Sequence, residues 1–141
     1  MSSQWEYIPQ GDTEAMVIDI LENSTEIDNF PGGPPTVSSD YTGYSMGARW
    51  IMVSREGGFL RWPHVDKPRI DLYVLAETRS VAHDLAQVAQ AVIRQAMGQA
   101  FPTYGVVLSD VQVETGITRV PDKETGSPRY VLALRLACVP S

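Results

Sequence analysis

The sequence has few of the residues on which cofactor and thiol chemistry depend. It contains one cysteine and two histidines, so an intramolecular disulfide is impossible and no CxxC pair is present for zinc or redox work. Cys138 lies in an alternating apolar run, where we expect it to face the core as a small hydrophobic side chain. We therefore predict no bound cofactor and no reactive thiol.

Motifs for catalysis and metal binding are also missing. His64 lies near Asp66, and His83 precedes Asp84, but neither pair has the spacing that would supply further metal ligands. No serine lies in a GxSxG turn, and the glycines at 57–58 are not followed by the Lys and Ser or Thr of a phosphate-binding loop. The sequence predicts that the protein is not an enzyme and acts by binding other proteins.

Positive charge and long apolar runs are scarce. The chain has 11 basic against 17 acidic side chains, a net charge of −6, which disfavours attraction to nucleic acid and to anionic lipid. No apolar run approaches the roughly 20 residues that cross a bilayer, and the first ten residues lack the features of a secretion signal. We therefore expect no membrane partner and a protein that is made and kept in a cytoplasm.

Hydrophobic periodicity predicts a mixed fold in a single domain spanning residues 1–141. Apolar side chains recur at helical spacing in residues 11–23 and 81–97, and a tight turn is expected at 56–58. The expected fold class is α+β, a mostly antiparallel four-stranded sheet with two main helices packed on one face. The four predicted strands lie at residues 48–55, 69–76, 105–118 and 129–139.

Two other segments suggest places where a partner could bind. Residues 24–47, rich in Pro and Gly, predict a long, partly extended connection, and the polar loop 120–128 is either a flexible excursion or a contact arm. Aromatic side chains in loops favour interfaces, although packing against their own domain is the alternative. The candidate inter-subunit or partner contacts are Glu56, Gly57, Gly58, Asp122, Lys123, Glu124, Trp5, Tyr7, Tyr41 and Tyr44.

Three short motifs follow one another within residues 48–92. They are a strand ending in Arg55-Glu56-Gly57-Gly58, a strand entry Lys67-Pro68-Arg69-Ile70, and a helix with Ala82, Leu85 and Ala86. In this order, and with the closing strand, polar loop and strand, they resemble the tail terminator proteins of long-tailed bacteriophages, particularly those of actinobacterial phages. The order of the predicted elements resembles that family over most of the chain, and the matching motifs cover about a third of it.

The resemblance implies a structural virion protein of the phage tail or neck. In that family an antiparallel sheet carries helices, and six copies form a ring that caps the tail tube, ends its growth and presents the surface for head joining. The implied partners are further copies of the chain, the tail tube protein and a head–tail connector protein, with DNA only as passing cargo. The resemblance brings no catalytic, metal or cofactor residue. A net charge of −6 in each copy suggests that the channel would repel DNA rather than hold it.

Two alternatives remain open. One is another neck or connector component, such as a head-closure or tail-completion protein. The other is a small-ligand-binding α+β domain that uses a cleft under the central helix. A small-ligand site there would need converging polar groups on the helix face of Leu85, Val88 and Val92, where the sequence has apolar residues.

Overall fold

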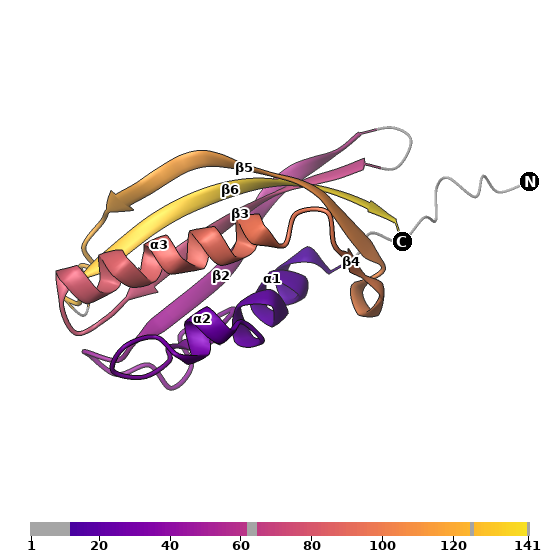
Figure 1. Cartoon of the computed structure of the whole chain (residues 1–141). Helices are drawn as coiled ribbons and strands as arrows, with labels where there is room; N and C mark the ends of the chain where they lie inside the picture. The colour runs from indigo at the N-terminus through magenta and orange to yellow at the C-terminus, as the bar shows by residue number, and fades with distance from the viewer. Residues whose placement is uncertain (1–11, 62–64, 125, 141) are drawn as a thin grey trace, which may run out of the picture.

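The fold is built on one curled, six-stranded sheet (Figure 1). The computed structural model describes residues 12–61, 65–124 and 126–140. The strand order is β1-β2-β3-β6-β5-β4, with β1 parallel to β2 and every other neighbouring pair antiparallel. The strands are β1 Thr36–Ser38, β2 Trp50–Arg61, β3 Val65–Leu75, β4 Ala100–Phe101, β5 Val106–Arg119 and β6 Arg129–Pro140.

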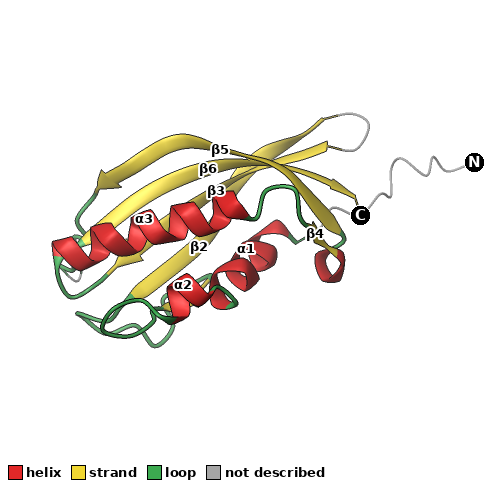
Figure 2. Cartoon of the chain, in the orientation of Figure 1, coloured by secondary structure: helices red, strands yellow, loops and turns green. Residues whose placement is uncertain are grey.

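Three α-helices cover one face of this sheet: α1 Thr13–Glu22, α2 Thr25–Asp28 and α3 Arg79–Gln95 (Figure 2). Side chains cap the first turns of α1 and α3. The Asp12 carboxylate accepts a hydrogen bond from the Ala15 backbone N–H at 2.9 Å, and the Thr78 hydroxyl accepts one from the Val81 backbone N–H at 3.2 Å. These side chains bond backbone N–H groups that have no partner within the helix and so define where each helix begins.

The predicted four-stranded sheet with two helices is wrong, although the α+β class is correct. Residues 24–47, expected to be a connection, contain α2 and β1, and β4 follows α3. These elements have only four, three and two residues, too few to show a hydrophobic period. They depend on their surroundings: the Ser24 hydroxyl caps α2, while β1 and β4 pair with much longer strands.

The predicted tight turn at Glu56-Gly57-Gly58 is also wrong, because β2 continues through it to Arg61. The pairing of β2 with β3 shifts register between Arg55 and Gly58, and Gly57 has a φ of +84°. An extra residue in one strand with a glycine at positive φ forms a β-bulge. Beyond the bulge Gly58 pairs with Pro68, so two of the motifs in the resemblance lie opposite each other in one hairpin.

The core lies between the sheet and the helices. Ala82, Ala86 and Ala89 of α3 are fully buried, and their small side chains allow the helix backbone to lie close to the sheet. The larger buried side chains around them are Met16, Val17 and Leu21 of α1, Leu85 and Ile93 of α3, and Ile51, Val53, Ile70, Leu72, Val74, Leu108, Leu132, Leu134 and Leu136 of the sheet.

Cys138 faces this core, as predicted, and is 2% exposed. Burial, with a smaller contribution from the nearby Asp66 carboxylate, raises the pKa of its thiol from 9.0 to about 12. Between these values the unfolded chain releases the proton and the folded chain keeps it, so the folded state loses stability as pH rises. We expect the free energy of unfolding to fall by up to about 1.4 kcal/mol per pH unit from this group.

Urea unfolding at a series of alkaline pH values tests this, with Cys138→Ala as the reference that lacks the thiol. The variant should show a shallower decline of the free energy of unfolding above pH 9.0. Parallel declines for the two proteins would contradict the assignment.

Candidate interaction surface

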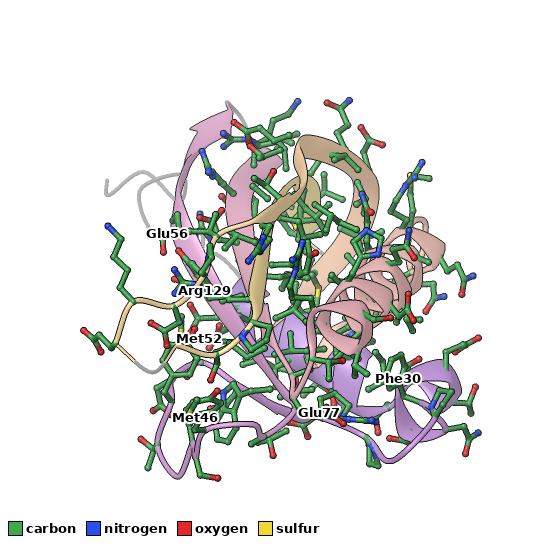
Figure 3. All side chains as sticks on the ribbon, turned by 90° about the vertical axis from the view of Figure 1, so that its left-hand side faces the viewer. Phe30, Met46, Met52, Glu56, Glu77 and Arg129 are labelled. Atoms are coloured by element: carbon green, nitrogen blue, oxygen red, sulfur yellow. The ribbon has the colours of Figure 1, made fainter. Side chains whose placement is uncertain are left out.

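One face of the sheet has no helix over it in the described part of the chain. Figure 3 places Met52, Glu56 and Arg129 on the side of the sheet away from α3. Strand register puts Tyr73 beside both Met52 and Val131 on the same side. We call this surface the open face. Its side chains are Met52, Ser54 and Glu56 of β2, Arg69, Asp71 and Tyr73 of β3, Arg129, Val131, Ala133 and Arg135 of β6, and Gln112 and Glu114 of β5.

Two ion pairs hold four of the six charged side chains of the open face in place. Arg69 and Arg135 are directly opposed across β3 and β6, an arrangement of like charges that is unfavourable unless it is compensated. Arg69 Nε bonds Asp71 at 2.9 Å, and Arg135 bonds Glu114 through two nitrogens at 3.0 Å. The hydrogen bonds from Arg135 lower the pKa of the Glu114 carboxyl. The hydrogen bond from Arg69 to Asp71 raises the pKa of the Arg69 guanidinium. Glu114 and Arg69 therefore stay charged near neutral pH.

Arg129 connects the open face to the polar loop 120–128. Its guanidinium lies 5.6 Å from the centroid of the Tyr73 ring, and its Nε donates a hydrogen bond to the Val120 carbonyl at 2.9 Å. Within the loop, the Gly126 N–H donates to the Asp122 carbonyl at 2.8 Å, and Ser127 is fully buried. The described part of the loop is thus anchored at its base beside the sheet.

Tyr41 and Tyr44 pack against their own domain, the alternative considered for them. Tyr44 meets Trp50 edge to face, with ring centroids 5.6 Å apart, and Tyr41 lies 5.7 Å from Tyr44. The Tyr44 hydroxyl hydrogen-bonds the Ser127 hydroxyl at 2.5 Å, which links the 24–47 segment to the polar loop. Burial raises the pKa of the Tyr41 hydroxyl, and the nearby Arg129 opposes this. The Tyr41 hydroxyl therefore stays protonated near neutral pH.

The structure brings several predicted contact residues together. Tyr41 and Tyr44 form one wall of a 460 Å³ cavity, and Asp122, Lys123 and Glu124 form another. Glu56 lies elsewhere on the open face, next to the bulge at Gly57, where the Ser54 hydroxyl donates to its carboxylate at 2.6 Å. Trp5 and Tyr7 lie outside the described residues.

The link between Tyr44 and Ser127 predicts a measurable effect on the polar loop. Tyr44→Phe removes the hydrogen bond to Ser127, so we expect faster amide exchange at the described loop residues and a loss of about 1 kcal/mol in the free energy of unfolding. Tyr130→Phe is the matched control, because the Tyr130 ring packs against His83 of α3 instead. Similar exchange rates in both variants would show that this hydrogen bond does not hold the loop.

A groove between α2 and α3 was not predicted. It has a volume of 680 Å³ and is lined mainly by apolar side chains of α3 and of the segment after α2, with Glu26 and Asp84 at its rim. Sequence reasoning placed Val88 and Val92 together on the core face of α3. The structure buries Val92, at 7% exposed, but leaves Val88 only partly buried. The groove was missed because its other wall, α2, was expected to be part of a connection.

The described residues were also predicted to lack a metal site. Across 12–61, 65–124 and 126–140, no group of three or more His, Cys, Asp or Glu side chains is placed to hold a metal ion. His83 and Asp84, one of the predicted pairs, are 4.0 Å apart at the surface of α3, and His64 lies outside the described residues. None of the described helices has the length and apolar character needed to cross a membrane.

The chain fits no protein-family model, and no curated protein is significantly similar to it. Its own geometry and the motifs in residues 48–92 are therefore the basis for interpreting its function.

Proposed function

We propose that this chain is a structural protein of a long-tailed phage whose copies form a ring on the tail tube. The ring would end tube growth and provide the surface to which the head joins. The observation that carries the proposal is the open face, a whole face of the sheet on which ion pairs hold four of the six charged groups in place.

The open face has the properties of a contact surface between proteins. Its paired charges are already partly shielded: the Asp71 and Arg135 side chains are 10% and 24% exposed. Covering them would require little further ordering, and ordering of side chains is one of the main costs of association. Fixed charges of both signs also favour one register between partners over others.

The arrangement also suits a ring in particular. The open face and the helix layer are different surfaces, so contact between the open face of one copy and another surface of the next would be heterologous. Heterologous contacts form rings when the rotation closes and filaments when it does not. The β2–β3 hairpin, whose far end extends beyond the helices in Figure 1, carries two motifs of the resemblance and borders the open face. This supports the same assignment.

The partners that follow from the proposal are further copies of the chain, the tail tube protein and a head–tail connector protein. DNA would pass through the ring without being held, which is consistent with the net charge of −6. A head-closure or tail-completion protein would use similar surfaces. Binding assays with purified tube protein and with portal-side proteins would separate these roles, because a terminator binds the end of the tube.

The first test is the solution mass of the full chain by light scattering over a wide concentration range, with and without tail tube protein, followed by electron microscopy. We expect the 15.5 kDa chain to give way to a closed ring. Val131→Arg, which adds bulk and charge in the open face, should prevent ring formation while the protein stays folded. Gln87→Arg, which adds the same charge on the exposed side of α3, should leave ring formation intact.

Three results would count against the proposal. A parent protein that stays monomeric even with tube protein would contradict ring formation. Open-ended filaments would indicate a tube-forming subunit. Equal assembly of the Val131 and Gln87 variants would show that the open face is not the contact surface.

A further inference from the structure

The α2–α3 groove has the shape of a site for an elongated apolar segment. One wall is formed by Phe30 and Pro31, and the other by α3 side chains that include Val81, Val88 and Ala91. Val81 and Val88 are partly buried and Ala91 is exposed. The residues of α3 that line the groove run from Val81 to Gln95. This lining stripe is therefore about 21 Å long. That length matches a helix of about four turns lying alongside α3.

The rim of the groove is acidic. Glu26 and Asp84 line it from opposite helices, and no Lys, Arg or His is among its described lining residues. The Ser24 hydroxyl donates a hydrogen bond to the Glu26 carboxylate at 2.9 Å, which orients that group. Asp84 has a side chain that is 63% exposed, so its carboxylate is free to meet a cation on an incoming segment.

The net charge of the whole protein is concentrated beside this groove. Helices α1 and α2 with their caps have no Lys or Arg, and the other 11 acidic side chains of the protein are balanced by its 11 basic ones. Since α3 adds only Arg79, Asp84 and Arg94, the helix layer that carries the groove keeps a net negative charge. The six acidic residues of the two helices and their caps are Asp12, Glu14, Asp19, Glu22, Glu26 and Asp28.

A cation beside Phe30, at one wall of the groove, is already paired. The Arg49 guanidinium lies 5.4 Å from the centroid of the Phe30 ring, but it forms an ion pair with Glu77 at 2.9 Å. It also donates hydrogen bonds to the carbonyls of Pro31 and Gly33, and its side chain is 14% exposed. Arg49 is thus already neutralised and held below the surface.

We propose that the α2–α3 groove binds a basic amphipathic helix of a partner protein. The apolar side of that helix would cover the stripe of Val81, Val88 and Ala91, and its Lys or Arg side chains would meet Glu26 and Asp84. Apolar burial supplies affinity in this mode, and charge complementarity supplies orientation and speed of association. The inference goes beyond ring formation and does not depend on it, since the groove lies on the helix side of the sheet and the open face on the other.

The test uses a fluorescent synthetic peptide of Leu and Lys at helical spacing as the probe, titrated with the full chain. A peptide with the same Leu positions and Glu in place of Lys is the matched control. We expect the Lys peptide to bind in the micromolar range, and the Glu peptide to bind at least about tenfold more weakly. Amide chemical-shift changes on adding the Lys peptide should centre on Val81, Val88 and Ala91.

Two pairs of variants separate groove binding from general attraction to an acidic protein. Glu26→Gln combined with Asp84→Asn should weaken binding about fivefold, whereas Asp110→Asn combined with Glu124→Gln, the same charge change away from the groove, should have no effect. Val88→Asn should weaken binding about tenfold, and Val113→Asn, at an exposed valine of β5, should not.

Each of these results decides the question. Equal loss in both charge pairs, equal loss in both valine variants, or shift changes centred elsewhere would overturn the proposal. Binding is measured on variants whose melting temperatures match the parent. Ring formation by the same variants, measured separately, keeps this result distinct from the proposed function.

Discussion

Replacing Arg49 with Met should lower the free energy of unfolding by about 3 kcal/mol and the melting temperature by roughly 10 °C. The methionine keeps most of the apolar stem and loses the guanidinium. Nη1 of Arg49 bonds two backbone carbonyls of the Pro/Gly segment, and Nε and Nη2 bond Glu77 just before α3. One side chain therefore holds together three parts of the chain that are distant in sequence, and its loss leaves the partly buried Gly33 carbonyl without this donor.

Thermal and urea unfolding, followed by circular dichroism, measure the effect. Glu77→Gln is a useful comparison, because it leaves the two carbonyl contacts of Arg49 intact and should cost much less. A loss of under about 1 kcal/mol for Arg49→Met would show that these contacts are not important for stability.

Gly32 allows a second test of the same cluster. A Cβ at Gly32 would lie 2.5 Å from Nη2 of Arg49, and Gly32 has a φ of +88°. Gly32→Ala should therefore cost about 1 kcal/mol more in the parent than in the Arg49→Met background, where the clash is relieved and only backbone strain remains. Gly33 is the control, because it has a φ of +119° and no atom lies within 4 Å of the position a Cβ would take. The stability losses of Gly33→Ala and Arg49→Met should therefore be additive.

Ala89→Leu should destabilise the protein by about 3 kcal/mol. Ala89 is fully buried on the face of α3 that packs on the sheet, and the other alanines of that face, Ala82 and Ala86, are also fully buried. Three extra carbon atoms there would have to push α3 away from the sheet, because a close-packed interior has no space for them.

Ala91→Leu is the matched control on the same helix. Ala91 is exposed in the α2–α3 groove, so the same substitution should change the free energy of unfolding by less than about 0.5 kcal/mol. Urea unfolding of both variants gives the comparison. If the two variants had similar stability, the close approach of α3 to the sheet would not be a determinant of the fold.

The long elements were predictable, because each has enough residues to show a period. The apolar spacing in α1 and α3, the alternation in β5 and β6, and the caps Asp12 and Thr78 are all local features. The sign of the net charge and the burial of Cys138 could also be inferred from composition and alternation. These features depend on neighbours in sequence, so no knowledge of distant contacts was needed.

The candidate surfaces were only partly predictable. Tyr41, Tyr44 and the loop residues Asp122 to Glu124 were each proposed as contacts, but nothing in the sequence indicated that they line one cavity. The open face was not predicted as a unit, because alternation along one strand shows which residues share a side but not which side the helices cover. The α2–α3 groove required knowing that residues after Ser24 form a helix.

The sequence by itself therefore determined the α+β class, the positions of α1, α3, β5 and β6, and the absence of recognisable motifs for catalysis. Tertiary structure decided the two short edge strands, α2, the bulge at Gly57 and the convergence of Arg49 with Pro31, Gly33 and Glu77. The physical reason is that a long element is stabilised largely by a pattern that recurs along its own residues. A short strand, a bulge or a buried cation is stabilised only by partners that folding brings to it from far along the chain.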